Sequence, residues 1–288
     1  MDWMQRIFVF LLATFAVSQV IALAIGAVFV AQQLTILENP EDPGNALTLM
    51  AYVLFSALAI LLILKYYAGR LLFLAIEFLL IFFSTQIVAA IFLPVPVAAA
   101  LALAVAALRF AFPGLRQYAI LYSTSVAGAL LGASLGIVPA VAFAILLAAY
   151  DFAAVFYTKH MIALAEGLGQ RGVAFSIQIT ASKSSSSATK INAKTSKKAK
   201  ISSSKRRIES IELGTGDLVI PAMLMVSSLK LSLLHSFAGL AGALAGLMTL
   251  LWVMERRRGY FPALPPIVLG SFVGLALATL YLFATQAT

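Results

Sequence analysis

The stretch Leu213-Gly214-Thr215-Gly216-Asp217-Leu218-Val219-Ile220-Pro221 opens a long apolar run and carries an ionisable side chain within it. A carboxylate at the centre of a membrane-spanning helix costs about 2.5 kcal/mol or more, so such a residue is by default a candidate for function. The same cost requires a partner that makes the acid tolerable there. Asp217 therefore predicts a functional site inside a membrane, with a partner elsewhere in the chain.

The composition supports a membrane location for the whole chain. Hydrophobic residues make up 62% of the 288 residues, charged residues make up 11%, and the mean hydropathy is +1.01. A soluble domain has about half apolar and about a quarter charged residues, so soluble classes of protein are excluded. The apolar runs are long and lack the alternation of an outer-membrane barrel. We expect an all-α, polytopic membrane protein.

Several kinds of chemistry are excluded by residue types alone. The sequence has no cysteine, which removes disulfides, thiolate nucleophiles and cysteine-bound metals. The two histidines, His160 and His235, fall near opposite faces of the expected membrane domain, and no His-Glu-x-x-His occurs. A zinc site is therefore not expected, and no other metal or cofactor is predicted. The first apolar run, 7–31, is long enough to span the membrane and lacks the short apolar core and cleavage site of a signal peptide.

The apolar runs predict nine transmembrane spans. About 20 residues at about 1.5 Å each cross the hydrocarbon core, so the fourth run is short for a span. Prolines mark several ends of the runs, as expected of a residue that disrupts helix interiors. The predicted spans cover residues 7–31, 46–64, 71–93, 97–112, 118–137, 139–158, 211–229, 235–254 and 261–283.

The basic residues predict how these spans are oriented. With the N-terminus inside, 19 of the 20 Lys and Arg lie on the inner side, and only Lys230 lies outside. The first outer loop, 38–43, has three acidic residues and no basic one. The positive-inside rule therefore predicts a cytoplasmic N-terminus and an external C-terminus. Because topology accounts for the net charge of +9, no nucleic acid is expected as a partner.

The chain is expected to divide into three parts. Residues 1–158 hold six spans, 159–210 form a cytoplasmic insertion, and 211–288 hold three spans. The middle of the insertion is rich in Ser and Lys and has no aromatic residue, so we expect a disordered tether whose charge also suits contact with anionic lipid headgroups. Its flanks, 172–180 and 208–213, alternate in part between apolar and polar residues and predict two short strands.

The expected partner of Asp217 is Asp151, near the inner end of the sixth span. Both carboxylates are expected roughly 10–15 Å below the inner surface, on antiparallel helices. Two carboxylates at one depth can share a proton, so that one serves as base and the other as acid. The alternative is two unrelated acids that cap helices or reach for the interface, but Asp is too short to reach far. Gly214 and Gly216 are expected to let the backbone pack closely before Asp217.

A third stretch, Pro262-Ala263-Leu264-Pro265-Pro266, begins the ninth span on the same inner side. Three prolines in five residues leave backbone groups without helical partners, which is tolerated in a membrane only against protein or a water-filled cavity. We expect an extended or kinked segment within reach of Asp217, with the backbone of Ala263 and Leu264 turned toward the aspartates. A polar cavity that opens toward the cytoplasm should adjoin them. The alternative is an ordinary helix start marked by proline.

Glycines four residues apart occur twice, at Gly128, Gly132 and Gly136 and again at Gly242 and Gly246. This spacing is typical of close helix packing in lipid. It predicts two pairs of tightly packed spans.

Two further signals leave alternatives open. Residues 132–136 fit Gly-x-Ser-x-Gly, with His235 as a distant companion on the outer side, so a serine protease is a weaker alternative. The motif lies on a span and not on the strand-to-helix turn that such an enzyme needs. Glu77, in the third span, is expected either to support the aspartates, or else to reach for the membrane interface or pair locally.

Together the three stretches resemble the presenilin and signal peptide peptidase family of intramembrane aspartyl proteases. That family has Tyr-Asp in its sixth span, Gly-x-Gly-Asp in its seventh and Pro-Ala-Leu at its ninth, and this chain has 150–151, 214–217 and 262–264 in those places. Thr215 departs from the more frequent Leu, which bears on substrate preference. The small loop and the lack of cysteine favour a prokaryotic, archaeal member.

The resemblance implies a presenilin-like fold and an aspartic-type endopeptidase. Its catalytic residues would be Asp151 and Asp217, and its substrates would be transmembrane helical peptides in the lipid bilayer. Assembly into a homo-oligomer is left as an alternative to a monomer. Supporting or substrate-binding roles are implied for Tyr150, Gly214, Thr215, Gly216, Pro262, Ala263 and Leu264.

The implied chemistry is hydrolysis by general acid–base catalysis, in which the pair activates a water molecule and protonates the peptide carbonyl. The substrate helix must unwind first, and the strand-like flanks and residues 262–264 are suited to hold it by β-augmentation. The main alternative is a proton-coupled secondary transporter that uses the aspartates as a relay. A prepilin-peptidase-like enzyme also uses Gly-x-Gly-Asp, but the Lys expected soon after that Asp is replaced here by Leu218 and Val219.

Overall fold

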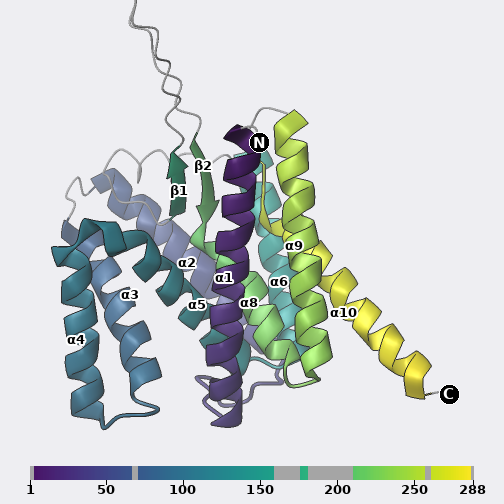
Figure 1. The fold of residues 1–288 in the computed structure, drawn as a ribbon, viewed down its shortest axis with the longest axis horizontal. Helices are drawn as coiled ribbons and strands as arrows, with labels where there is room; N and C mark the ends of the chain where they lie inside the picture. The colour runs from purple at the N-terminus through teal and green to yellow at the C-terminus, as the bar shows by residue number, and fades with distance from the viewer. Residues whose placement is uncertain (1–2, 67–70, 159–175, 181–209, 257–260, 287–288) are drawn as a thin grey trace, which may run out of the picture.

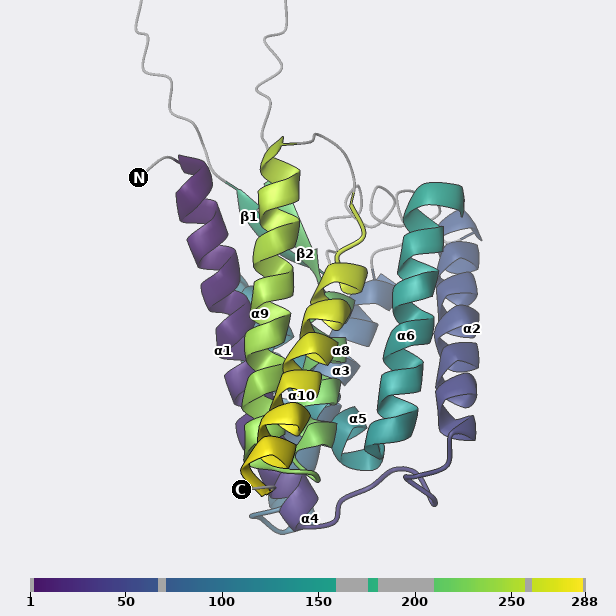
Figure 2. The same ribbon diagram turned by 90° about the vertical axis from the view of Figure 1, so that its right-hand side faces the viewer.

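The computed structural model describes residues 3–66, 71–158, 176–180, 210–256 and 261–286. Over these ranges the chain forms nine α-helices that lie side by side and two short strands at one end of them (Figures 1 and 2). The fold is therefore the predicted all-α membrane bundle. Its helices are α1 (Trp3–Ala31), α2 (Gly44–Tyr66), α3 (Leu71–Ala89), α4 (Val95–Ala111), α5 (Arg116–Ser134), α6 (Ile137–Ala153), α8 (Thr215–Ser228), α9 (Leu233–Arg256) and α10 (Leu264–Gln286).

Six of the helical segments are long and apolar enough to cross a membrane on their own, and they lie in α1, α2, α3, α6, α9 and α10. A seventh candidate is the pair formed by α4 and the segment Pro113–Ser134, which is bent by 113° and begins with a 3-10 turn, η1 (Pro113–Leu115). Helix α8 is shorter, with 14 residues. The chain is thus an integral, multi-pass membrane protein, for which nine crossings is an approximate count.

Helix α8 is the central helix of the bundle. All residues from 220 to 228 are buried, and the helix packs against α1, α5, α6, α9 and α10. Glycines on α5 permit this close packing: a Cβ added to Gly128 would lie 2.6 Å from the Ala222 Cβ, and one added to Gly132 would lie 2.7 Å from the Val226 Cβ. The first predicted glycine pair is therefore confirmed at these two positions.

Helices α9 and α10 form the second close pair. A Cβ on Gly242 would overlap the carbonyl oxygen of Gly270, and one on Gly246 would overlap the carbonyl oxygen of Pro266. Gly136 was expected to belong to the first glycine set, and that expectation is wrong. It lies outside the helices as the extended N-cap residue of α6, where it faces the Glu41 carboxylate of the α1–α2 loop.

The two flanks of the insertion form the predicted strands, β1 (Ser176–Thr180) and β2 (Ser210–Gly214). They pair in antiparallel register from Ser176 opposite Gly214 to Thr180 opposite Ser210. Helix α8 follows β2 directly, so the predicted span 211–229 is helical only from Thr215. Apolar composition alone could not separate the end of the strand from the start of the helix. The Ser/Lys-rich middle of the insertion lies outside the described residues.

The ends of the bundle differ in charge. Lys65, Arg109 and Arg256 lie in the last turns of α2, α4 and α9. These helix ends gather at the end of the bundle where α1 begins and where β1 and β2 lie, whereas α10 ends at the opposite end (Figures 1 and 2). The arrangement agrees with the charge asymmetry of the sequence, and the side of the membrane that each end faces stays a prediction.

Candidate active site

Asp151 lies in the last turn of α6, and only 4% of the residue is exposed. The backbone N–H of Leu264, the first residue of α10, donates a hydrogen bond of 3.2 Å to its Oδ2 atom. The backbone of Ala263 lies next to the same carboxylate. Asp151 is followed by a short π-helix, η2 (Ala154–Thr158), a feature that is frequent at functional sites. An N–H group at the start of α10, which has no acceptor within its own helix, thus binds the carboxylate at the end of α6.

Asp217 is the third residue of α8 and is half-buried. Its Oδ2 atom accepts a 3.2 Å hydrogen bond from the backbone N–H of Gly214, which is the N-cap residue of the helix. Gly214 has extended backbone angles, because it is also the last residue of β2. The change from strand to helix therefore fixes the carboxylate at the helix start, where negative charge is favoured by the helix dipole.

The two aspartates are close enough for their charges to interact. They are brought together by one apolar cluster that α6, α8 and α10 share, in which Leu147, Ile220 and Leu264 are all buried. Leu147 lies one turn before Asp151, and Ile220 lies about one turn after Asp217, so packing of this cluster turns both carboxylates to the same region. Neither forms a salt bridge with a basic residue in the part of the chain that the structure describes.

The proline-rich stretch occupies the expected place. Residues 261–263 are not helical, Pro262 is buried, and α10 begins at Leu264. The contact that the structure shows is with Asp151, whereas the expectation named Asp217. Pro265 and Pro266 lie in the first turn of α10, where a helix has no hydrogen-bond partner for its N–H groups in any case. Pro265 and Pro266 therefore do not interrupt α10. The non-helical backbone is confined to residues 261–263, which precede the helix.

The remaining predicted residues differ in their surroundings. Tyr150 packs against the same apolar cluster and interacts electrostatically with Asp151. Thr215 is the first residue of α8 and is half-buried. Gly216 is exposed, and a Cβ added there would meet no atom within 4 Å. The expectation that Gly216 allows close backbone packing is therefore wrong, because the space beside it is open.

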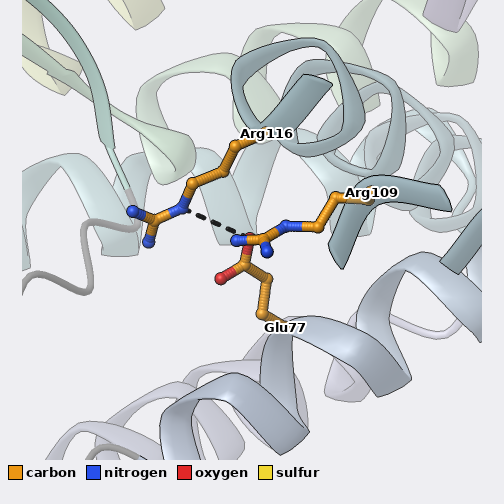
Figure 3. A network of polar contacts seen from close by, with 3 residues as sticks. All are labelled: Glu77, Arg109 and Arg116. Carbon is orange, nitrogen blue, oxygen red and sulfur yellow. Dashed lines mark hydrogen bonds and ion pairs between the residues drawn. The ribbon is translucent and has the colours of Figure 1, made fainter. Parts of the chain in front are cut away.

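Glu77 pairs locally and does not reach the aspartates. It is buried on α3, and its carboxylate is bound by Arg109 of α4 and by Arg116 of α5, the latter at 3.3 Å (Figure 3). Of the two expectations for Glu77, local pairing is the one confirmed. The network joins three helices that carry neither aspartate.

The Gly-x-Ser-x-Gly stretch has a structural role. The Ser134 hydroxyl is fully buried and accepts a 3.0 Å hydrogen bond from the backbone N–H of Ile36. The ring nitrogens of His235 contact the hydroxyl groups of Ser232 and Thr279 instead. No described histidine is thus available to activate Ser134, which removes the basis of the serine-protease alternative.

Grooves of measurable size lie away from the aspartates. One groove of about 370 Å³ lies between α3 and α5, and another of about 340 Å³ lies between α1 and α9. Both are lined mainly by apolar side chains on membrane-spanning helices. The polar cavity expected beside the aspartates stays a prediction.

One residue next to the site carries no motif that marks it in the sequence. Gln19 of α1 is 1% exposed, and its Nε2 atom donates a 3.1 Å hydrogen bond to the backbone carbonyl of Leu218, the residue after Asp217. The only signal in the sequence is an amide side chain in an otherwise apolar span.

The fold is shared with proteins of known structure. The family model described as signal-peptide peptidase, presenilin aspartyl protease matches residues 12–284. A presenilin family intramembrane aspartate protease of known structure has 22% sequence identity and a TM-score of 0.67, over 95% of this chain and 99% of that chain. A second crystal form of a protein with the same description gives 24% identity and a TM-score of 0.61, over 93% and 96% of the two chains. No curated protein matches the chain. The chain therefore belongs to the signal-peptide peptidase and presenilin family of aspartyl proteases.

Proposed function

We propose that this intramembrane aspartyl protease hydrolyses peptide bonds of transmembrane helices with Asp151 and Asp217 as its catalytic pair. One observation carries the assignment: the buried cluster shared by α6, α8 and α10 places both carboxylates at one region of the bundle, and neither forms a salt bridge with a described basic residue. Two such acids beside one another are best accommodated by sharing one proton. A proton that the pair shares is one that it can give and take during catalysis.

The reaction follows from that shared proton. The ionised member accepts a proton from water while the water oxygen bonds to the carbonyl carbon, and the protonated member donates its proton to the carbonyl oxygen. The carboxylic acid formed in that step then donates a proton to the amide nitrogen, while the other carboxylate accepts a proton from a hydroxyl group of the tetrahedral intermediate. The C–N bond breaks, and a carboxylic acid and an amine are released. Neither step needs a covalent bond between enzyme and substrate. The carboxylates change roles between the steps, so the pair is one catalytic unit.

The substrate must be extended where it is cut, because a helix covers its own carbonyl groups. Two features support binding of an extended segment: β2 pairs with β1 along one edge only among the described residues, and residues 261–263 are not helical and lead directly to the Leu264 N–H that binds Asp151. An unwound substrate strand added to either would gain backbone hydrogen bonds. The open space at Gly216 leaves room for it next to Asp217. Tyr150 and Thr215 would then help to orient the substrate.

The topology and partners follow the charge pattern. The N-terminus and the insertion 159–210 would face the cytoplasm of a prokaryotic cell, and the C-terminus would face outside. The N-terminal part, 1–158, and the C-terminal part, 211–288, would each supply one aspartate. Single cysteines at Ser186 and Thr288, on a chain with no cysteine of its own, test this orientation. Labelling of Ser186→Cys from outside intact cells would contradict it.

The function is tested by incubating the purified protein in lipid with a fluorescently labelled transmembrane peptide. We expect cleavage that an aspartyl-protease transition-state analogue inhibits, and no cleavage by Asp151→Ala or Asp217→Ala, both still inserted and folded. Substantial cleavage by either variant would overturn the catalytic assignment. No cleavage by the parent, with a proton flux in liposomes that needs both aspartates, would support the transporter alternative, which no present observation favours.

A further inference from the structure

Gln19 lies where α1 contacts the start of α8. Phe15 and Ala22, one turn away on either side of it, are fully buried, so its amide group is enclosed by the bundle. Its Nε2 atom donates to the carbonyl oxygen of Leu218 at 3.1 Å and reaches the Ser18 hydroxyl at 3.3 Å. Leu218 itself is 1% exposed and packs in the same apolar cluster as Phe15. The contact therefore ties α1 to the residue that follows Asp217.

The first turn of α8 is held by few hydrogen bonds of its own. The first four N–H groups of a helix have no helical acceptor. In addition, Pro221 has no N–H group, so the carbonyl of Asp217, four residues earlier, receives no helical hydrogen bond. The backbone at Asp217 is thus held by fewer helical hydrogen bonds than in a regular helix, although its carboxylate accepts one from the Gly214 N–H group. A contact from outside the helix has a correspondingly larger influence on where this carboxylate lies.

The stability of the fold does not explain an amide at this position. The Oε1 atom of Gln19 is buried and has no hydrogen-bond partner among the described residues. A buried amide oxygen without a partner destabilises a protein, and an apolar side chain of similar shape would avoid that penalty. Compared with an apolar side chain of similar shape, the Gln19 amide adds one contact, the hydrogen bond to the Leu218 carbonyl.

We propose that Gln19 is a positioning residue for Asp217, an inference that rests on the proposed catalytic role of the two aspartates. By holding the Leu218 carbonyl, Gln19 fixes the first turn of α8 and directs the Asp217 carboxylate toward Asp151. Without this hydrogen bond the turn has freedom to shift, and a displacement of about 1 Å at a catalytic group can cost about 100-fold in rate. Substrate binding elsewhere along the enzyme is unaffected.

The chain offers a matched control in Ser236 of α9. Its hydroxyl is buried and donates a 2.9 Å hydrogen bond to the carbonyl of Met225, near the other end of the same α8 helix. Gln19 and Ser236 thus make the same kind of contact with the same helix, one beside Asp217 and one two turns away from it. A purely structural role would make both positions behave alike.

The test compares purified Gln19→Leu, Gln19→Glu and Ser236→Ala with the parent enzyme on a labelled transmembrane peptide. For Gln19→Leu we expect kcat to fall by about 10- to 100-fold with KM unchanged, and a melting temperature no lower than that of Ser236→Ala. Ser236→Ala should lose stability and keep its kcat. Gln19→Glu can donate to the Leu218 carbonyl only when protonated, so its activity relative to the parent should rise as the pH falls.

Three outcomes would overturn the inference: parental kcat in Gln19→Leu, a loss of kcat in both Gln19→Leu and Ser236→Ala that follows their loss of stability, or a pH-independent ratio for Gln19→Glu. The last of these decides the matter if Gln19→Leu does not fold. Cleavage by Asp217→Ala under the same conditions would instead overturn the proposed function itself. The two failures are therefore distinguishable.

Discussion

Acidic side chains lie inside the bundle, fully or half-buried, at two places, and their charges are compensated differently at each. Glu77 lies among α3, α4 and α5, where the guanidinium groups of Arg109 and Arg116 compensate its charge. Asp151 and Asp217 lie among α6, α8 and α10, where each faces another acid and receives backbone N–H donors. Both places carry the cost of removing a carboxylate from water.

The neighbours of each acid determine what it can do. Glu77, bound by arginines, holds helices together, whereas an aspartate beside another aspartate is suited to exchange a proton. At Glu77 the opposite charges are already present in the protein, so no proton is needed to make the site tolerable. At the aspartates two like charges would repel one another, and one proton between them relieves the repulsion. Removal of acids from water is therefore compatible with a structural role at Glu77 and with the catalytic role proposed for Asp151 and Asp217.

The largest effect is expected from Asp151→Asn and Asp217→Asn. Each substitution keeps the shape of the side chain and removes its ability to exchange a proton, so cleavage should fall by about 1,000-fold or more. The melting temperature should not fall, because a like charge has been removed from the pair. Rates on a labelled transmembrane peptide and thermal unfolding measure the two quantities. A variant that cleaves at a tenth of the parental rate would contradict the comparison.

Glu77→Gln should give the opposite pattern. Removing one member of a buried charge network leaves the two arginines without their shared carboxylate, at a cost of about 3 kcal/mol in the free energy of unfolding. The kcat of the folded enzyme should stay at the parental value, because the network contacts neither aspartate. Glu255→Gln, at an exposed position in the last turn of α9, is the control for a change of charge alone. A lower kcat with unchanged stability would show that Glu77 belongs to the site.

Much of this arrangement was predictable because charges are rare in apolar runs. Asp151, Asp217 and Glu77 stand out against spans that hold almost no other ionisable group, and the glycine spacing correctly indicated close helix packing at α5 and α9, although it did not identify α8 and α10 as their partners. The alternating flanks of the insertion likewise predicted β1 and β2, and the long apolar runs predicted an integral membrane protein made of helices.

Other features depend on contacts that a sequence does not display. Gly136 shares the spacing of its neighbours, but α5 ends before it, and spacing does not reveal a helix end. Gly216 belongs to a motif, yet only the packing of α8 shows that the space beside it is open. The choice between the two roles of Glu77 required knowing that α4 and α5 bring arginines to it. Gln19 has no charge and belongs to no motif, so its contact with Leu218 appears only in three dimensions.

A smaller effect is expected from Pro262→Ala. Pro262 precedes the free amides at the start of α10, and its replacement allows the helix to extend backward and to take up the N–H group of Leu264 in its own hydrogen bonds. Loss of that donor to Asp151 should lower kcat by about tenfold, with little change in stability. Pro265→Ala is the matched control, because Pro265 lies within the first turn of α10 and no change in the start of the helix is expected. Equal rates for both variants and the parent would show that the amide does not influence the acid pair.

The smallest effect is expected from Gly216→Ala. This variant tests whether a substrate approaches the aspartate pair at the start of α8, in contrast to the Glu77 network, for which no substrate contact is proposed. Apart from its chain neighbours and the backbone of its own helix, the added Cβ lies within 4 Å of no atom of the described residues, and Ala in place of Gly should stabilise the start of α8 by about 0.5 kcal/mol. Any loss of activity must therefore come from what approaches the helix from outside. We expect KM for the labelled peptide to rise about threefold with kcat unchanged, the pattern of a lost binding contact.

Gly132→Ala supplies the contrast, because a Cβ there would lie 2.7 Å from the Val226 Cβ and 3.1 Å from the backbone nitrogen of Ser227. That variant should be destabilised by overpacking, by about 1–3 kcal/mol, without a specific change in KM. Thermal unfolding and steady-state kinetics on the two variants separate packing from access. Parental KM in Gly216→Ala would mean that the substrate reaches the aspartates without passing the start of α8, and the non-helical segment at 261–263 would then be the remaining candidate for its binding site.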